Sequence, residues 1–345
     1  MRAPLLQGLA LSLSFLSLSV NAQAQAAPAT WAPTGQLEYV VPGGPGAALD
    51  FAARKLTELL AKEGITGGFV VSNKVGAHAI QALEAVQRQP GAQTLTTLSS
   101  SYMSSQAQGA LPPHLRTLTP LATLFREFTT VVVRADSPVR NAADLIAQLR
   151  KDPGALSIGI ANTLGNHIHL GVAEPLKLGG VDITRLRIVP YKSSAESMTA
   201  LIGGHLDVVA ATTPNLVQFL QAGRVRVIAV PADERLGGVF ASSPTWKEQG
   251  IPYASQSFQG VMTSAGATPA QKAFWENALR RVTQTREWQD FVAHNQWKPH
   301  FLGADATAEV VRTQVHQTHA LLSELGLLPA DAPAPAKVAA ADARK

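Results

Sequence analysis

The chain has 345 residues, of which 46% are hydrophobic and only 15% charged, a composition that suits a globular protein of two ordinary domains and excludes a disordered chain. Lysine and arginine outnumber aspartate and glutamate by 29 to 24, which gives a net charge of +5. The basic residues form no long run, which argues against nucleic-acid binding. The absence of cysteine excludes disulfides, thiolate zinc sites and a cysteine nucleophile.

The first 26 residues have the pattern of a cleavable secretory signal peptide. Arg2 precedes an apolar stretch from Leu5 to Val20, and small residues follow as far as Ala26. The apolar stretch is too short to span a bilayer comfortably, because a membrane helix needs roughly 20 apolar residues. A permanent membrane anchor is the alternative. We therefore predict an exported, periplasmic protein, with a flexible leader at 27–36 and a disordered Ala/Pro-rich tail at 328–345.

Between these ends, short β-branched stretches alternate with amphipathic ones, which is typical of parallel α/β layers. Strands are expected at 37–41, 69–71, 94–98, 129–133, 156–161, 186–189, 206–211, 225–230 and 258–263. Helices are expected from 49 until Gly64, and at 141–151, 166–178, 195–202, 269–283 and 305–325, the last with Asp305 as candidate N-cap. Nine strands are many for one sheet in a chain of this length, so we predict two sheets, each with its own helices.

A glycine-rich loop follows the first predicted strand. It runs from Pro42 to Ala47 and leads into a helix whose first turn carries Asp50. Backbone N–H groups at such a helix start can bind an anion. A dinucleotide site fits less well, because Leu49 stands where the Rossmann motif needs a small residue. A tight turn without a ligand is the remaining alternative.

Three later strand-to-helix junctions are also polar, at 160–166, 189–194 and 211–215. Ligands of open α/β sheets bind beyond the carboxyl ends of the strands. We therefore expect these loops to converge on one crevice.

No catalytic constellation is evident. The sequence has neither a G-x-S-x-G nucleophile motif nor a Walker loop. His167 and His169 are two residues apart and would not share a helix face, whereas His316 and His319 would share one but fit a surface pair better than a metal site. We predict no catalytic residues, no metal and no cofactor.

Several short motifs occur in a fixed order from Leu37 to Leu327. They are V-V-P-G-G-P-G-A-A-L-D at Val40–Asp50, V-S-N-K-V-G-A at Val71–Ala77, G-N-H-I-H-L at Gly165–Leu170, V-P-Y-K-S at Val189–Ser193, and later segments at Gly203–Asp207, Ala222–Val230 and Thr268–Pro269. With these motifs the chain resembles the periplasmic solute-binding receptors of tripartite tricarboxylate transporters. The chain departs from the family pattern at Ala47, Thr163 and Ser193, which stand in place of glycine, and at 90–95, which lacks the usual Asp-Gly-Tyr before Thr-Leu. The identity of the ligand is therefore not transferred.

The resemblance implies a type II periplasmic-binding-protein fold, an α/β architecture of two sheets flanked by helices with a hinge and a ligand cleft between them. By position, domain 1 would comprise 37–134 plus 245–327, and domain 2 would comprise 135–244. Known members of the family bind small carboxylates, largely through backbone amides and ordered waters. Closure on the ligand would be a hinge motion.

From the loops and the resemblance together, we predict that Gly43 to Ala47 present amides to one carboxylate and that loops of domain 2 hold the opposite end, with Lys192 as a candidate counter-charge. The predicted ligand-binding residues are Gly43, Gly44, Pro45, Gly46, Ala47, Ser100, Ser101, Asn162, Thr163, Gly165, Asn166, His169, Lys192, Ser193, Ser194, Thr212 and Thr213.

The predicted function is that of a monomeric, non-enzymatic receptor. It would capture a small carboxylate and deliver it to the membrane subunits of a tripartite tricarboxylate-type transporter. The alternatives are an exported α/β enzyme that acts on a carboxylate or nucleotide, and a receptor that reports its ligand to a signalling partner.

Overall fold

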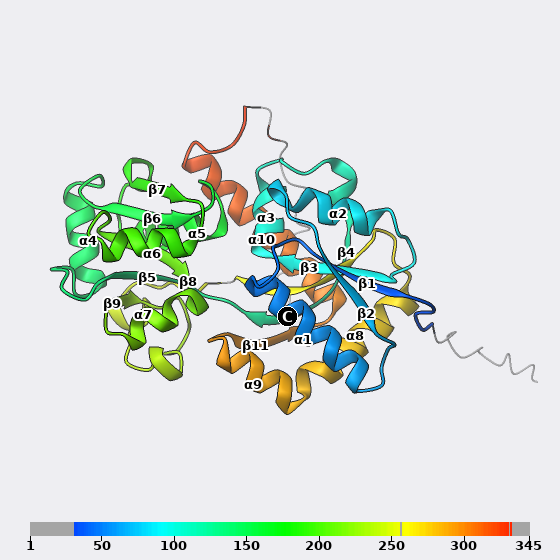
Figure 1. Ribbon diagram of the computed structural model, residues 1–345. Coiled ribbons are helices and arrows are strands. Elements are labelled where there is room, and N and C mark those ends of the chain that lie inside the picture. The colour runs from blue at the N-terminus through cyan, green and yellow to red at the C-terminus, as the bar shows by residue number, and fades with distance from the viewer. Residues whose placement is uncertain (1–30, 256, 331, 333–345) are drawn as a thin grey trace, which may run out of the picture.

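The computed structural model describes residues 31–255, 257–330 and 332, so the predicted signal peptide at 1–26 lies outside the described residues. The described part forms two halves, each a sheet flanked by helices (Figure 1). The strands are β1 Leu37–Val41, β2 Phe69–Asn73, β3 Thr94–Ser99, β4 Thr119–Arg126, β5 Thr129–Arg134, β6 Ser157–Ala161, β7 Arg187–Tyr191, β8 Val208–Thr212, β9 Val225–Ala229, β10 Phe258–Thr263 and β11 Lys298–Leu302. The α-helices are α1 Ala48–Lys62, α2 Ile80–Gln87, α3 Ser100–Ala107, α4 Ala142–Lys151, α5 His167–Leu178, α6 Ser194–Ile202, α7 Val217–Gln221, α8 Pro269–Gln284, α9 Arg286–His294 and α10 Ala304–Glu324.

The larger half is built on a six-stranded sheet of order β11-β4-β10-β3-β1-β2. Strand β1 pairs in parallel with β2 and β3, whereas β10 is antiparallel to both β3 and β4. Helices α1, α8 and α9 cover one face, where the buried Trp275 and Trp288 lie in the core. Helices α2, α3 and α10 cover the other face. Both faces are apolar, as expected for a sheet buried between helices.

The smaller half is built on a five-stranded sheet of order β7-β6-β8-β5-β9. Strand β6 is parallel to β7 and β8, and β5 runs antiparallel to β8 and β9. Helices α4 and α5 pack on one face, and α6 packs on the other. The carboxyl ends of β6 and β7 lead into the polar junctions singled out in the sequence.

The chain passes twice between the halves, at residues 127–128 and again through the segment that precedes β10. The two passages touch, because the N–H of Glu127 donates to the carbonyl of Ser257 at 3.2 Å. Strand β5, which the sequence analysis placed in domain 1, pairs within the five-stranded sheet. We therefore propose residues 127–128 as the first domain boundary.

Helix α10 packs against both halves. Val311, Val315 and Leu322 lie in the core of the six-stranded half, whereas Leu321 and Leu325 also pack against the core of the five-stranded half. Figure 1 shows the end of α10 beside the smaller half. Each half thus contributes to the surroundings of this helix.

All nine predicted strands and all six predicted helices form close to their expected limits. The count of nine was too low, since β4 and β11 were missed. Both contain a proline, Pro120 and Pro299, which weakens a strand pattern. The expectation of parallel layers was also incomplete, because both sheets are mixed. Finally, Gly303 rather than Asp305 is the N-cap of α10, and Asp305 lies in its first turn.

Within the described residues, no helix combines the length and the apolar character needed to cross a membrane.

Candidate functional site

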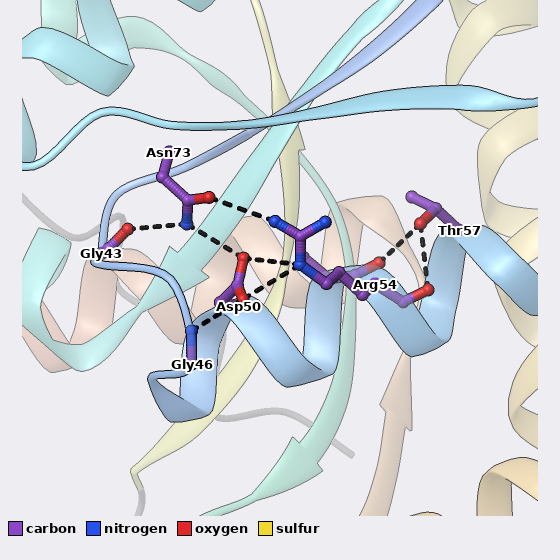
Figure 2. Close-up of polar contacts among 7 residues, drawn as sticks. Gly43, Gly46, Asp50, Arg54, Thr57 and Asn73 are labelled. Carbon is purple, nitrogen blue, oxygen red and sulfur yellow. Dashed lines mark hydrogen bonds and ion pairs between the residues drawn. The ribbon is translucent and has the colours of Figure 1, made fainter.

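The loop between β1 and α1 is closed by a hydrogen bond from a glycine amide to a side chain four residues later. Gly46 has a φ of 76°, which glycine adopts at little cost. Its N–H donates to Oδ2 of Asp50 at 2.9 Å (Figure 2). The N-cap residue Ala47 has no side chain that could accept a hydrogen bond. Asp50 therefore provides an acceptor that the start of the helix otherwise lacks.

Asp50 also ties this loop to β2. Asn73 donates from Nδ2 to Oδ1 of Asp50 and to the carbonyl of Gly43, both at 2.9 Å (Figure 2). Arg54 donates from Nε to both carboxylate oxygens at 3.0 Å. Burial by itself would raise the pKa of Asp50, but hydrogen bonds from Arg54, Gly46 and Asn73 outweigh it and hold the pKa below its ordinary value. A negative charge thus stands at the N-terminus of α1, where the helix dipole favours it.

These bonds decide which amides of the glycine-rich loop remain for a ligand. The N–H of Gly46 is taken by Asp50, the N–H of Ala47 donates to the carbonyl of Gly44 at 3.2 Å, and Pro45 has none. The N–H groups of Gly43 and Gly44 have no acceptor among the described residues. Of the five predicted residues in this loop, only these two can therefore present amides without breaking an internal bond.

The loop between β6 and α5 repeats this geometry in the other half. Gly165 has a φ of 77°, and its N–H donates to Nδ1 of His169, again four residues later, at 3.0 Å. Asn166 caps the helix, since its Oδ1 accepts from the N–H groups of Ile168 and His169 at 3.0 Å. The side chains of Asn166 and His169 therefore hold the loop in shape.

His169 is only 3% exposed. Burial lowers its pKa to about 4, so the ring is neutral at neutral pH. Because Nδ1 accepts from Gly165, the ring proton resides on Nε2, which has no partner among the described residues. The structure shows His169 supporting the loop through Nδ1, whereas its direct contact with a ligand remains a prediction.

Asn162 also holds the loop through its backbone. It has a φ of 66°, and its N–H donates to the carbonyl of Tyr191 at 2.7 Å. The N–H groups of Thr163 and Leu164 have no acceptor among the described residues. This loop therefore offers two unused amides, as the loop of the other half does.

Two helix N-termini meet between the halves. Oγ of Ser101 on α3 lies 3.5 Å from Nδ1 of His167 on α5, and Gln108 donates from Nε2 to the carbonyl of Gly165 at 3.1 Å. Neither helix carries an acid in its first turn. Burial lowers the pKa of His167 to about 4, so this ring is neutral as well. The first turns of these two described helices therefore supply no carboxylate to compensate their dipoles.

The junction before α6 differs, because a carboxylate already occupies it. Ser193 accepts at Oγ from the N–H of Glu196 at 3.2 Å, and the N–H of Lys192 donates to Oε2 of Glu196 at 3.1 Å. The side chain of Lys192 is exposed and forms no ion pair with a described residue. Ser194 is half-buried as the first residue of the helix. A second anion would compete with Glu196 for the same helix start.

The predicted threonines at the end of β8 have structural partners. Oγ1 of Thr212 accepts from Asn215 at 2.8 Å. Thr213 is fully buried and donates from Oγ1 to the carbonyl of Gln296, in the other half, at 3.2 Å. Thr213 therefore joins the halves.

A cavity of about 380 Å³ lies between α3, α5, α10 and the segment before β10. Of the predicted residues only Ser100 lines it; it is buried, and its Oγ has no partner among the described residues. Sequence reasoning missed the other polar lining residues, which include Ser104, Glu174, Tyr253 and Thr318. These residues come from three separate helices and from the segment before β10, and no local motif marks them. Among the described residues, no cluster of three or more histidines and carboxylates could hold a metal ion.

Comparison with known proteins identifies the family. The family described as "Tripartite tricarboxylate transporter family receptor" matches residues 52–327. A UPF0065 protein of Bordetella bronchiseptica is 30% identical over 282 residues, which cover 77% of this chain and 78% of that protein. A UPF0065 protein of Cupriavidus necator is 28% identical over 197 residues, and the match spans only 58% of its length.

Solved structures share the fold. MatC of Rhodopseudomonas palustris, determined with bound malate, has 20% identity and a TM-score of 0.67 and covers 83% of this chain and 98% of its own. A second protein of R. palustris, determined with adipate, has 23% identity and a TM-score of 0.70 and covers 86% of this chain and 99% of its own. These likenesses show that the fold of two sheets flanked by helices is shared. The match over residues 52–327 establishes that the chain belongs to the receptor family of tripartite tricarboxylate transporters.

Proposed function

We propose that the protein is a periplasmic receptor that binds a small carboxylate between its two halves and delivers it to the membrane subunits of a tripartite tricarboxylate-type transporter. Membership of the family and the malate and adipate bound to proteins of the same fold support this role. The ligand would be released unchanged, because the receptor needs no catalytic group for capture and delivery.

The observation that carries the proposal is the meeting of α3 and α5. Their N-termini lack a first-turn acid and approach each other at Ser101 and His167. A helix N-terminus without a compensating carboxylate favours an anion by its dipole and its unpaired N–H groups. A ligand carboxylate placed here would have the same position relative to α3 and α5 that Asp50 has at the start of α1 and Glu196 has at the start of α6.

Unused backbone amides extend the same site into both halves. Gly43 and Gly44 come from the loop after β1, and Thr163 and Leu164 come from the loop after β6. Both loops follow the carboxyl ends of central strands, where ligands of open sheets bind. A carboxylate that accepts from both loops would hold the halves together, and the linked passages at 127–128 and 257 would act as the hinge.

Thermal unfolding of the full protein with mono-, di- and tricarboxylates tests this role. A ligand at 100 times its Kd stabilises a protein by about 2.7 kcal/mol, which raises the melting temperature measurably. We expect Ser101→Ala to weaken binding about threefold to tenfold, whereas Ser323→Ala, at an exposed position of α10, should leave it unchanged. The proposal fails if no carboxylate shifts the melting temperature.

Delivery needs a separate measurement. Cells that lack the receptor should lose uptake of the radiolabelled ligand, and the wild-type gene should restore it. If uptake is unchanged while the purified protein still binds, the receptor serves another partner, such as a sensor.

A further inference from the structure

The cavity between α3, α5 and α10 adjoins the helix starts assigned to the carboxylate, because Ser100 and His167 line it. Neither the loop at 43–47 nor the loops at 162–166 and 192–194 line it. Its volume of about 380 Å³ lies within the range of small-molecule sites. Its walls come from both halves, because α3 and α10 belong to the six-stranded half and α5 to the five-stranded half. An occupant would therefore contact both sides of the hinge.

The ionisable groups of this cavity leave one negative charge unmatched. Lys177 is ion-paired with Glu324, and the neutral ring of His167 adds no charge. Glu174 is exposed overall but lines the cavity, and it forms no hydrogen bond or ion pair with a described residue. Burial raises the pKa of Glu174, and the positive charge of Lys177 offsets this only in part. The same charge contributes to a raised pKa of Tyr253, after burial as the main cause. The carboxylate therefore lacks a cationic partner of its own.

An independent observation points to an occupant. Ser100 is 5% exposed, lines the cavity, and has an Oγ without a partner among the described residues. A buried hydroxyl without a hydrogen bond costs about 1 to 3 kcal/mol, so such groups usually meet a ligand or water. Ser104 lies one helical turn further on the same wall, and Met103 and Leu170 supply apolar surface beside them. Hydroxyl oxygens, a carboxylate and apolar walls together suit a group with several N–H donors on a short hydrocarbon chain.

We propose that this cavity binds a small organic ammonium compound, with the ammonium at Glu174, hydrogen bonds to the serine hydroxyls of α3, and its hydrocarbon part against Met103 and Leu170. The amine site would adjoin the carboxylate site at the starts of α3 and α5 and share none of its loops. Because its walls come from both halves, the amine changes the equilibrium of the hinge, and each ligand changes the affinity for the other by the same factor. The proposal does not depend on delivery to a transporter.

Titration calorimetry of the full protein with butylammonium chloride tests this site, with 1-butanol as the uncharged isostere and sodium chloride as the ionic control. We expect saturable binding of butylammonium alone. Glu174→Gln keeps the shape and removes the charge, and it should weaken binding at least tenfold, because hydrogen bonds to a charged group are the strong ones. Glu309→Gln, an exposed acid of α10 outside the cavity, should bind as the wild type does.

Two results would overturn the proposal. One is no saturable binding of butylammonium at millimolar concentration, which would leave the cavity to water. The other is equal binding by wild type and Glu174→Gln. Thermal unfolding of both variants without ligand shows whether each is folded. Repeating the titration with saturating carboxylate separates the sites, since displacement of the amine would place both ligands in one cavity and contradict a separate site.

Discussion

The loops after β1 and β6 contain the same glycine hydrogen bond, but its acceptor differs in chemistry. In each, a glycine with a φ near +77° donates its N–H to a side chain four residues later, Gly46 to Asp50 and Gly165 to His169. In the six-stranded half the acceptor is a carboxylate with a lowered pKa, whereas in the five-stranded half it is a neutral imidazole. Both acceptors are buried.

This difference determines what each helix start can still attract. Asp50 puts a fixed negative charge at the N-terminus of α1, and Arg54 pairs with it. His169 shapes the loop before α5 without adding charge, so the dipole of α5 stays available to an anion from solution. We therefore propose that α5 attracts a carboxylate more strongly than α1 does, and that Gly43 and Gly44 support the ligand through backbone hydrogen bonds.

The largest expected effect tests how tightly each glycine is enclosed. A Cβ at Gly165 would lie 2.9 Å from Cδ2 of the fully buried Leu322, whereas a Cβ at Gly46 would meet nothing within 4 Å. Both positions carry the cost of a positive φ, about 1 to 2 kcal/mol, and overpacking adds to it at Gly165. We expect Gly165→Ala to lose about 3 kcal/mol and Gly46→Ala about 1 to 2 kcal/mol in chemical unfolding. Equal losses would show that Leu322 moves aside.

A pH titration distinguishes the two acceptors. Below pH 6.5 the unfolded chain protonates His169 while the folded protein does not, so this histidine removes stability as the pH falls from about 6.5 to about 4. The difference between these pKa values corresponds to about 3 kcal/mol. The stability from Asp50 is present above its unfolded pKa and is lost only as the pH falls below about 4, because its folded pKa is lowered. We expect His169→Gln, whose amide oxygen can still accept from Gly165, to reduce the loss of stability between pH 7 and pH 4.

A second buried group changes stability over the same pH range. It is Glu127, an acid at the hinge that accepts a hydrogen bond from Gln259 at 2.8 Å. Burial raises its pKa to about 7. Between about pH 4.5 and pH 7 the folded protein therefore retains a proton that the unfolded chain has lost, and stability falls as the pH rises. This slope opposes that of His169 and masks it in the wild type. Glu127→Gln should be more stable at pH 8 by about 3 kcal/mol and should expose the histidine slope fully. An unchanged pH profile in both variants would contradict these assignments.

Replacement of the charged Asp50 by a neutral asparagine should change the free energy of unfolding by a smaller amount. In Asp50→Asn the side chain can still accept from one donor, but Arg54 loses its charge partner and the new NH₂ group faces donors. We expect a loss of about 2 kcal/mol in chemical unfolding at pH 7, the magnitude of a charge-assisted hydrogen bond. Arg54 is half-exposed and can turn to solvent, which keeps the loss moderate. A loss below about 0.5 kcal/mol would mean that Asn73 alone holds the loop.

The smallest effect on stability is expected at Gly44, which has no positive φ and no atom near an added Cβ. Gly44→Ala should change the free energy of unfolding by less than about 0.5 kcal/mol. Carboxylate affinity should nevertheless fall, because the new methyl group lies beside an amide assigned to the ligand. Calorimetry of Gly44→Ala and Gly46→Ala together separates the roles of these glycines. Undiminished affinity in Gly44→Ala would remove this amide from the site.

Much of the fold could be predicted from local sequence. Alternating apolar patterns located the nine expected strands, and Asn141 and Asn166, at the starts of two predicted helices, are N-caps whose side chains accept backbone hydrogen bonds. Strand β4 was missed because Pro120 weakens its pattern, whereas β11 is a short edge strand of the described sheet that contains Lys298 and Pro299 and pairs with β4. No local sequence pattern predicts such a strand.

The sequence by itself determined the two-sheet α/β architecture, the family and the glycine-rich helix starts, because these depend on periodicity and on residues close together in the chain. The acceptors of Gly46 and Gly165 lie only four residues away, but only the structure showed that these amides are already used, and only tertiary packing brought Asn73 to Gly43 and Asp50. It alone also brought Ser101 to His167 and placed Ser100 and Glu174 around one cavity. Such contacts join residues that are distant in sequence, and their geometry follows from how the two halves pack.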